Sequence, residues 1–173
     1  SRCASLKQIT IPDSVKEIPD QAFTGCASLY IVNLGAVESV GVAAFYSLQM
    51  LGKVDFGDSL KSIADNAFYH CINLRKIDNF FVFPESLTSI GHMAFDTNDY
   101  ETSLKLPDSL ISIGDGAFDT WRRLKAVIVP DNVTYLGRGA FQQNSALANA
   151  TIGKSVKPLR PAVFNSCPKV TFV

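Results

Sequence analysis

The chain has 173 residues, of which 47% are hydrophobic and 18% are charged, which is enough apolar material for one packed domain and too much for a disordered chain. Its 16 basic and 16 acidic residues cancel, so the composition lacks the basic excess of proteins that bind nucleic acid or anionic lipid. No apolar run approaches the ~18 residues needed to span a bilayer, and the chain opens without a signal peptide. We therefore expect neither nucleic-acid binding nor membrane insertion within this chain.

One motif recurs along the whole chain. An Ala-Phe pair or its counterpart returns with its phenylalanine at Phe23, Phe45, Phe68, Phe95, Phe118, Phe141 and Phe164. The spacings are 22, 23, 27, 23, 23 and 23 residues. A fixed period in this range is typical of a solenoid, in which each unit buries its apolar face against its neighbours. The repeat predicts a single array over residues 1–173, with about seven units of ~23 residues.

Each unit has the same internal order, which we number from Leu6 as position one. Apolar residues stand at positions one, four, six, ten, thirteen, seventeen and eighteen, and proline usually stands at position seven. The alternation before Pro12 predicts a short strand that ends at the proline. Asp13-Ser14 then predicts a turn, Val15 and Ile18 return to the core, and Ala22-Phe23 predicts a tight helical or 3₁₀ turn. Strands of successive units should pair in parallel.

The unit reads Leu-x-x-Ile-x-Ile-Pro-x-Ser-Val-x-x-Ile-x-x-x-Ala-Phe-x-x-Cys, and residues 106–118 follow it almost position by position. This pattern resembles the Treponema-type, or BspA-like, leucine-rich repeat, and the resemblance covers essentially the whole chain. It implies a curved right-handed β/α solenoid, with a parallel sheet on the concave face and short turns or 3₁₀ segments on the convex face. It also implies a location at the cell surface or secretion, and a role in adhesion and protein binding.

Both ends of the chain fall inside a unit. Residues 2–6 match residues 25–29 at the tail of a unit, and residues 170–173 match the head of another. We therefore expect a piece of a longer array. The terminal units carry no polar cap, which predicts end-to-end self-association of this chain.

The four cysteines occupy one column of the repeat, three residues after the phenylalanine or its expected place. They are Cys3, Cys26, Cys71 and Cys167. Other residue types fill the column elsewhere, which favours a buried, small hydrophobic role over metal binding. Only Cys3 and Cys26 lie on adjacent units, so a disulfide between them stays open.

Three other patterns contain residue types that can carry chemistry. Gly57-Asp58-Ser59-Leu60 resembles the nucleophile motif of GDSL-type hydrolases, but the same column reads Pro-Asp-Ser in other units, so we interpret Ser59 as a turn residue. The acidic stretch from Asp96 to Glu101 lacks the spacing and glycine of an EF-hand. His70 and His92 occupy different unit positions and do not converge. We expect no catalytic residue, no cofactor and no metal.

Outward positions of the strands are where a ligand would bind. The fourth unit carries four extra residues within residues 78–83, which leaves two registers: either Ile77 or Phe81 fills position four. In the second register Phe80 and Val82 face outward. Exposed aromatic residues beside Lys and Arg are typical of protein hot spots. The candidate binding residues are Tyr30, Ile31, Lys53, Arg75, Lys76, Phe80, Phe81, Lys105 and Ile128. The alternative is that the insertion folds back on a neighbouring unit.

The sequence thus favours a non-enzymatic recognition or adhesion module that binds a protein through its sheet face. A protein on a host or neighbouring cell surface is the expected partner. One alternative is a structural spacer that holds another domain away from the cell surface. A weaker alternative is carbohydrate binding, for which Tyr30 and Phe80 could stack on sugar rings.

Overall fold

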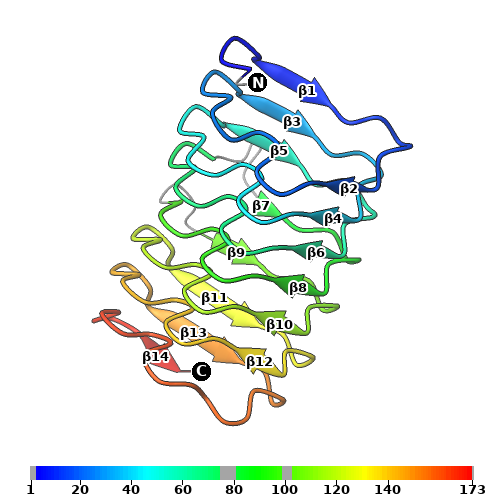
Figure 1. Cartoon of the computed structure of the whole chain (residues 1–173). Helices are drawn as coiled ribbons and strands as arrows, with labels where there is room; N and C mark the ends of the chain where they lie inside the picture. The colour runs from blue at the N-terminus through cyan, green and yellow to red at the C-terminus, as the bar shows by residue number, and fades with distance from the viewer. Residues whose placement is uncertain (1–2, 75–80, 99–102, 173) are drawn as a thin grey trace.

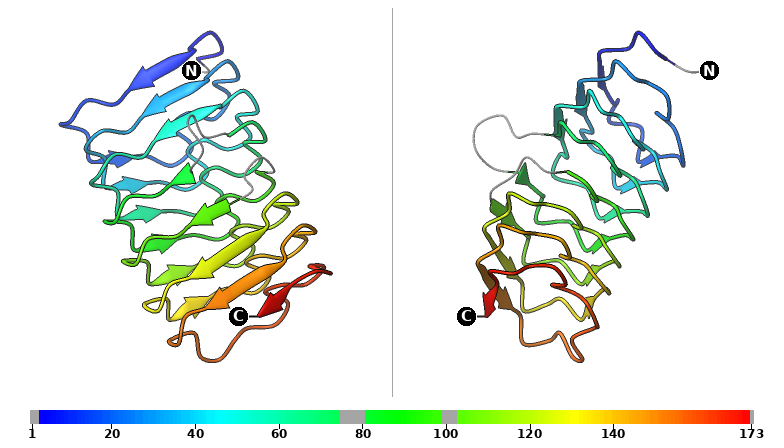
Figure 2. Two further views of the ribbon diagram at one scale, coloured as in Figure 1. Left: turned by 180° about the vertical axis from the view of Figure 1, so that it is seen from behind. Right: turned by 90° about the vertical axis from the view of Figure 1, so that its left-hand side faces the viewer.

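The chain forms a ladder of stacked turns, each passing through two short strands (Figure 1). The computed structural model describes residues 3–74, 81–98 and 103–172. Within these ranges the chain contains strands and turns but no helix, so the solenoid is confirmed whereas the expected helical segments are not. The Ala-Phe segments are turns instead. The two ends of the chain lie at opposite ends of the ladder (Figure 2).

One side of the ladder, here called the first face, carries the strands predicted to end at position seven. These are β1 (Gln8–Thr10), β3 (Ile31–Asn33), β5 (Lys53–Asp55), β7 (Phe81–Val82), β9 (Ser103–Lys105), β11 (Ala126–Val129), β13 (Asn149–Ile152) and β14 (Thr171–Phe172). Among the described residues they pair in two parallel groups, β1-β3-β5 and β7-β9-β11-β13-β14. The division falls where the fourth unit carries its extra residues.

A second parallel sheet, which the sequence analysis placed among the turns, runs unbroken beside the first face. Its strands are β2 (Glu17–Ile18), β4 (Ser39–Val40), β6 (Ser62–Ile63), β8 (Ser89–Ile90), β10 (Ser112–Ile113) and β12 (Tyr135–Leu136). Each strand has two residues, one outward and one buried at position thirteen. A strand of two residues shows no alternation of apolar and polar side chains, so the sequence predicts a turn at these positions.

The phenylalanine of each unit lies on that of the next and builds a continuous stack through the core. Ring centroids of successive phenylalanines from Phe23 to Phe164 are 4.9 to 5.8 Å apart, and their planes differ by 3 to 8°. The five inner rings are fully buried. One residue per turn at a strand spacing of about 4.8 Å brings flat rings close to van der Waals contact, so the repeat length itself dictates the stack.

The cysteine column proves to be a ladder of hydrogen bonds between units. In five units a side chain of this column donates to the backbone carbonyl of the phenylalanine one unit before. The bonds are Cys71 Sγ to Phe45 at 3.1 Å, Asn98 Nδ2 to Phe68 at 3.1 Å, Trp121 Nε1 to Phe95 at 2.7 Å, Asn144 Nδ2 to Phe118 at 3.2 Å and Cys167 Sγ to Phe141 at 3.1 Å. The column therefore favours small or flat side chains that can donate a hydrogen bond. The predicted hydrophobic role describes their burial but not this bond.

The cysteines themselves are all free thiols, and the alternative of a Cys3–Cys26 disulfide does not apply in this structure. The burial predicted for the column holds for Cys26, Cys71 and Cys167, whereas Cys3 is exposed at the first turn. Burial raises the pKa of the Cys71 thiol to about 12. That value keeps the thiol protonated and able to act as a donor.

The second sheet ends at β12, whereas the first face continues for two more strands, β13 and β14. In the seventh unit Pro158 occupies the place of the strand residue and supplies no backbone N–H for the ladder. Arg160 then folds back so that its guanidinium carbon lies 4.4 Å from the centre of the Tyr135 ring. This cation–π contact covers part of the terminal strand.

Candidate functional site

Position five is the last outward residue of the first-face strand in each of the seven units, and the role of its side chain depends on the residue at position seven. In the second and third units position seven is glycine with a positive φ, +53° at Gly35 and +62° at Gly57. The side chain two residues earlier accepts the glycine N–H: Asn33 Oδ1 at 2.9 Å and Asp55 Oδ1 at 3.1 Å. In these units the side chain at position five is therefore needed to stabilise the turn that follows it.

The next three units carry proline at position seven, namely Pro84, Pro107 and Pro130. Proline has no N–H, so position five is released from the capping role and need not be Asn or Asp. It is Val82, Lys105 and Ile128 in these units, here called the outward row. The strand register pairs Val82 with Lys105 and Lys105 with Ile128, so the three residues are direct neighbours.

The outward row places apolar side chains in solvent on both sides of a cation. Val82 is 57% and Ile128 is 65% exposed. Lys105 Nζ lies 3.9 Å from Glu85 Oε1, and both side chains are largely exposed, so this ion pair holds the lysine only weakly. Nothing in the fold of these units requires the row to be apolar. The outward row is therefore a candidate binding surface on the described first face.

The predicted site residues divide between the two strand groups of the first face. Ile31 in β3 and Lys53 in β5 are half-buried register partners. Lys105 and Ile128 are register partners in the second group. Arg75, Lys76 and Phe80 lie outside the described residues. The prediction that all nine form one surface stays a prediction.

The structure decides between the two registers left open for the fourth unit. Phe81 pairs with Leu104, a position-four residue, and Val82 pairs with Lys105. This is the register in which Phe81 fills position four and Val82 faces outward. Val82 was absent from the candidate residues, although Pro84 two positions later marks Val82 as position five.

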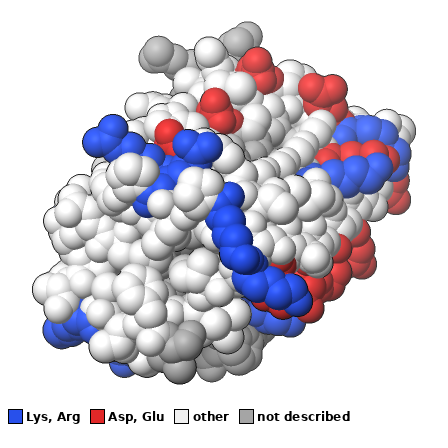
Figure 3. Space-filling model, turned by 90° about the horizontal axis from the view of Figure 1, so that it is seen from below, with Lys and Arg blue, Asp and Glu red and all other residues white. Residues whose placement is uncertain are grey.

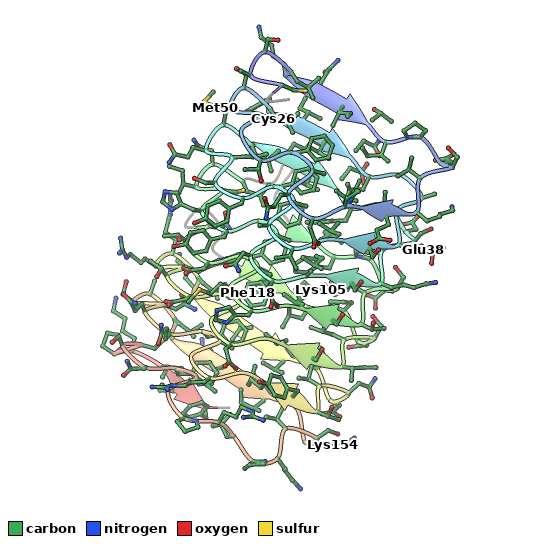
Figure 4. All side chains as sticks on the ribbon, viewed as in Figure 1. Cys26, Glu38, Met50, Lys105, Phe118 and Lys154 are labelled. Atoms are coloured by element: carbon green, nitrogen blue, oxygen red, sulfur yellow. The ribbon has the colours of Figure 1, made fainter. Side chains whose placement is uncertain are left out.

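Tyr30 lines a separate hollow at the opposite edge of the face, where the strands begin. The ring lies across Gly52, and a Cβ at Gly52 would be only 2.4 Å from Tyr30 Cε2. Tyr30 and Met50, which are 50% and 54% exposed, line this hollow of about 210 Å³ together with Gly52 and Asn73. Met50 points outward at this edge of the ladder (Figure 4). Ile128 is not among the residues that line this hollow, so Tyr30 and Ile128 do not share a binding pocket.

Ile128 lines a larger hollow, here called the corner hollow, of about 390 Å³. It lies where β11 and β13 end and their turns begin. Its lining residues are Asp108, Ile128, Val129, Pro130, Asp131, Asn132, Thr151, Ile152 and Gly153. One of its acids is paired, since Lys154 Nζ is 2.9 Å from Asp131 Oδ2, and this contact lowers the pKa of Asp131.

The hydrolase-like motif is part of the turn column, as interpreted from the sequence. The serines that occupy the position of Ser59 in the next two units, Ser86 and Ser109, each donate at 2.7 Å to a carbonyl of the preceding unit. Gly57 packs so closely that an added Cβ would lie 2.0 Å from the Gly35 oxygen. In the described part of the chain, no three His, Cys, Asp or Glu side chains are grouped so that they could hold a metal ion.

The turns carry a buried pair of acids, of which only Asp96 belongs to the acidic stretch considered from the sequence. Asp96 and Asp119 occupy the same column one unit apart and are only 8% and 5% exposed. Burial, with the Asp119 charge as the second cause, raises the pKa of Asp96 to about 6. Thr97 donates to Asp96, and both Thr120 and Gln142 donate to Asp119. These bonds satisfy the pair within the fold, which favours a structural role.

Comparison with known proteins agrees with this architecture. The model of the BspA type leucine-rich repeat region matches residues 1–80 and 78–173 with 6 copies. A leucine-rich repeat protein from Bacteroides ovatus is 27% identical with a TM-score of 0.85, over 96% of this chain and 45% of that chain. The T. pallidum leucine-rich repeat protein is 24% identical with a TM-score of 0.62, over 96% and 68% of the respective chains, and shows the fold alone.

The chain thus spans less than half the length of the B. ovatus protein that it matches. The comparison with curated proteins gives no match. In the described ranges, no helix has the length and apolar character needed to cross a membrane. On the evidence of the two family-model matches, which together cover the chain from end to end, the protein belongs to the BspA-type leucine-rich repeat family.

Proposed function

We propose that the chain is a non-enzymatic recognition module that binds a protein partner through its first face, at the cell surface or after secretion. The observation that carries the proposal is the outward row. Two exposed apolar side chains flank a lysine on a rigid sheet, at positions that the fold leaves free. Apolar anchors beside a cation, on a scaffold that loses little entropy on binding, are suited to protein recognition.

The family and the site support this proposal in different ways. Leucine-rich repeats supply a long, regular surface and no deep cavity, so affinity must come from area and a few anchors. The first face supplies such anchors at Tyr30, Val82 and Ile128. A uniformly polar first face would instead favour a spacer.

The test is a binding screen against purified extracellular proteins by biolayer interferometry. The double variant Val82→Ser, Ile128→Ser removes both apolar anchors of the row, and we expect at least fivefold weaker binding of a protein that binds the intact chain. Ile111→Ser is the matched control, because Ile111 is also 50% exposed but lies beside the second sheet.

Two results would refute the proposal. If the double variant binds as tightly as the intact chain, the outward row is not the binding surface. If the intact chain binds no protein in a broad panel, the spacer function is the better explanation. Circular dichroism melts of both variants check that the fold is intact.

Self-association belongs to the same proposal. The first face ends at β14, where Phe172 is 61% exposed and its ring contacts Phe164 edge-on at 5.4 Å. We expect the chain to associate at high concentration and Phe172→Ser to weaken that association. Sedimentation that shows a monomer for the intact chain at every concentration would contradict this expectation.

A further inference from the structure

We propose that the corner hollow receives a basic side chain, an arginine or a lysine, from the protein partner. The inference rests on the proposed function, because the hollow shares Ile128 with the outward row, and it adds the chemistry of the partner. The partner segment would carry at least one cation beside apolar residues. Three observations support it: the shape and lining of the hollow, the unpaired acid on its rim, and a cation of the chain itself in the same column.

The lining suits a long side chain with a charged end. Ile128, Val129, Pro130 and Ile152 supply apolar surface, and Asp108 supplies a carboxylate. Arginine and lysine bury their methylene stems on apolar surface while the charged end stays at a polar rim. The volume of about 390 Å³ is at the lower end of the usual range for ligand pockets, roughly 300–1,000 Å³. It fits a side chain of a peptide better than a large cofactor.

The charge of the rim selects a cation. Position eight carries an acid in five of the seven units, namely Asp13, Asp58, Glu85, Asp108 and Asp131. Among the salt bridges of the described residues, Glu85 and Asp131 have a cation partner and Asp108 has none. Seen from below, acidic and basic side chains are interspersed over the upper and right-hand parts of the molecule, so single ion pairs rather than one large charged patch mark this surface (Figure 3).

The chain itself shows how this column receives a cation. Lys154 stands at position eight in the seventh unit, where it follows Asp131 in the column. Its Nζ lies 2.9 Å from Asp131 Oδ2, and its backbone N–H donates to Asp131 Oδ1 at 3.1 Å. Asp108 offers the same kind of carboxylate one unit earlier. An acidic partner would be repelled there, and the lining holds no aromatic ring for a sugar to stack on.

The experiment is an NMR titration of the intact chain with the peptide acetyl-Gly-Arg-Arg-Gly-amide at low ionic strength. The control peptide carries citrulline, which keeps the shape of arginine without its charge. We expect shifts at the Ile128 methyl and the Gly153 amide with the arginine peptide alone. Asp108→Asn should weaken the apparent affinity roughly five- to tenfold, as expected for loss of a charge-assisted contact.

Asp58→Asn is the matched variant, because Asp58 is an exposed acid of the same column outside the corner hollow. It should leave the titration unchanged. Equal shifts with the citrulline peptide, equal effects of the two variants, or no shift at the hollow at millimolar peptide would each overturn the inference. These failures are separate from failure of the proposed function. A partner that depends on Val82 and Ile128 without any peptide binding at Asp108 would refute only the basic side chain.

Discussion

The second sheet and the first face are built from the same repeat but differ in how much their outward residues vary from unit to unit. The second sheet is unbroken over six strands, and four successive units place serine at the same outward register position: Ser39, Ser62, Ser89 and Ser112. The first face changes its outward residue from unit to unit and tolerates the insertion of the fourth unit. The second sheet and the phenylalanine stack hold the units together, so the first face is free to vary.

Position seven shows how this freedom arises. In the second and third units it is a glycine with a positive φ, and position five, Asn33 or Asp55, accepts the glycine N–H. In the next three units it is proline, which has no N–H, and Val82 or Ile128 can stand at position five. Over these five units the residue at position seven therefore determines whether the side chain at position five is needed for the turn or is free for binding.

The largest expected effect is in the phenylalanine stack. Phe95 is fully buried between Phe68 and Phe118, at centroid distances of 5.2 and 5.7 Å. Phe95→Ala opens a cavity that the stacked turns cannot close, and we expect a loss of about 3–5 kcal/mol in the free energy of unfolding. Urea denaturation measures it. A loss below about 1 kcal/mol would mean that the units are held together elsewhere.

The hydrogen-bonded column should give the next largest effect. Asn144 donates to the Phe118 carbonyl at 3.2 Å and accepts the Trp121 backbone N–H at 2.6 Å. Asn144→Leu keeps the volume but leaves two buried backbone groups unpaired, which should cost about 2–3 kcal/mol. Leu48 already occupies this column, so the substitution fits sterically. Unchanged stability in urea would show that the column is filled for packing alone.

The buried acid pair predicts a pH dependence with a defined sign. The pKa of Asp96 is about 6 in the folded chain against an ordinary value of 3.8, so the folded state binds the proton more tightly. This carboxyl therefore lowers stability progressively as the pH rises from about 4 to about 6, and its effect is constant above that. The groups that face it are Asp119, Thr97 and His70.

Asp96→Asn removes this titration and keeps an oxygen for Thr97. Relative to the intact chain, the variant should gain about 1–2 kcal/mol between pH 4 and pH 7, after allowance for partial solvent screening. Thermal unfolding across that range measures the difference. Asp131→Asn is the control. Because Lys154 lowers the pKa of Asp131, the stability difference between this variant and the intact chain should change with pH in the opposite direction. A pH-independent difference for Asp96→Asn would show that Asp96 titrates normally.

Much of the fold could be predicted from sequence because the repeat is dictated by burial. Apolar residues at fixed positions foretold the first-face strands, the core phenylalanines and the end of each strand at position seven. The two-residue strands of the second sheet could not be foreseen, since two residues show no period. The hydrogen-bond donor role of the cysteine column could not be foreseen either, because Cys, Asn and Trp differ widely in hydropathy and form no recognisable sequence pattern.

The binding surface was harder to predict for a physical reason. The core does not constrain the residue type at outward positions, so the repeat gives their places but not which of them bind. The outward positions of the repeat pointed to Lys105 and Ile128, whereas Val82 required the register of the fourth unit. The rule linking position five to position seven emerged only once the Asn33 and Asp55 hydrogen bonds were seen.

Some residues of this chain hold the ladder together, and others are free to bind a partner. The most direct test of this division is the free energy of unfolding of the triple variant Val82→Ser, Lys105→Ser, Ile128→Ser, measured beside that of Phe95→Ala under the same conditions. We predict that the triple variant lies within about 1 kcal/mol of the intact chain, because exposed side chains with weak contacts contribute little. A loss of about 3 kcal/mol or more would contradict it, because the outward row would then belong to the structure that holds the units together.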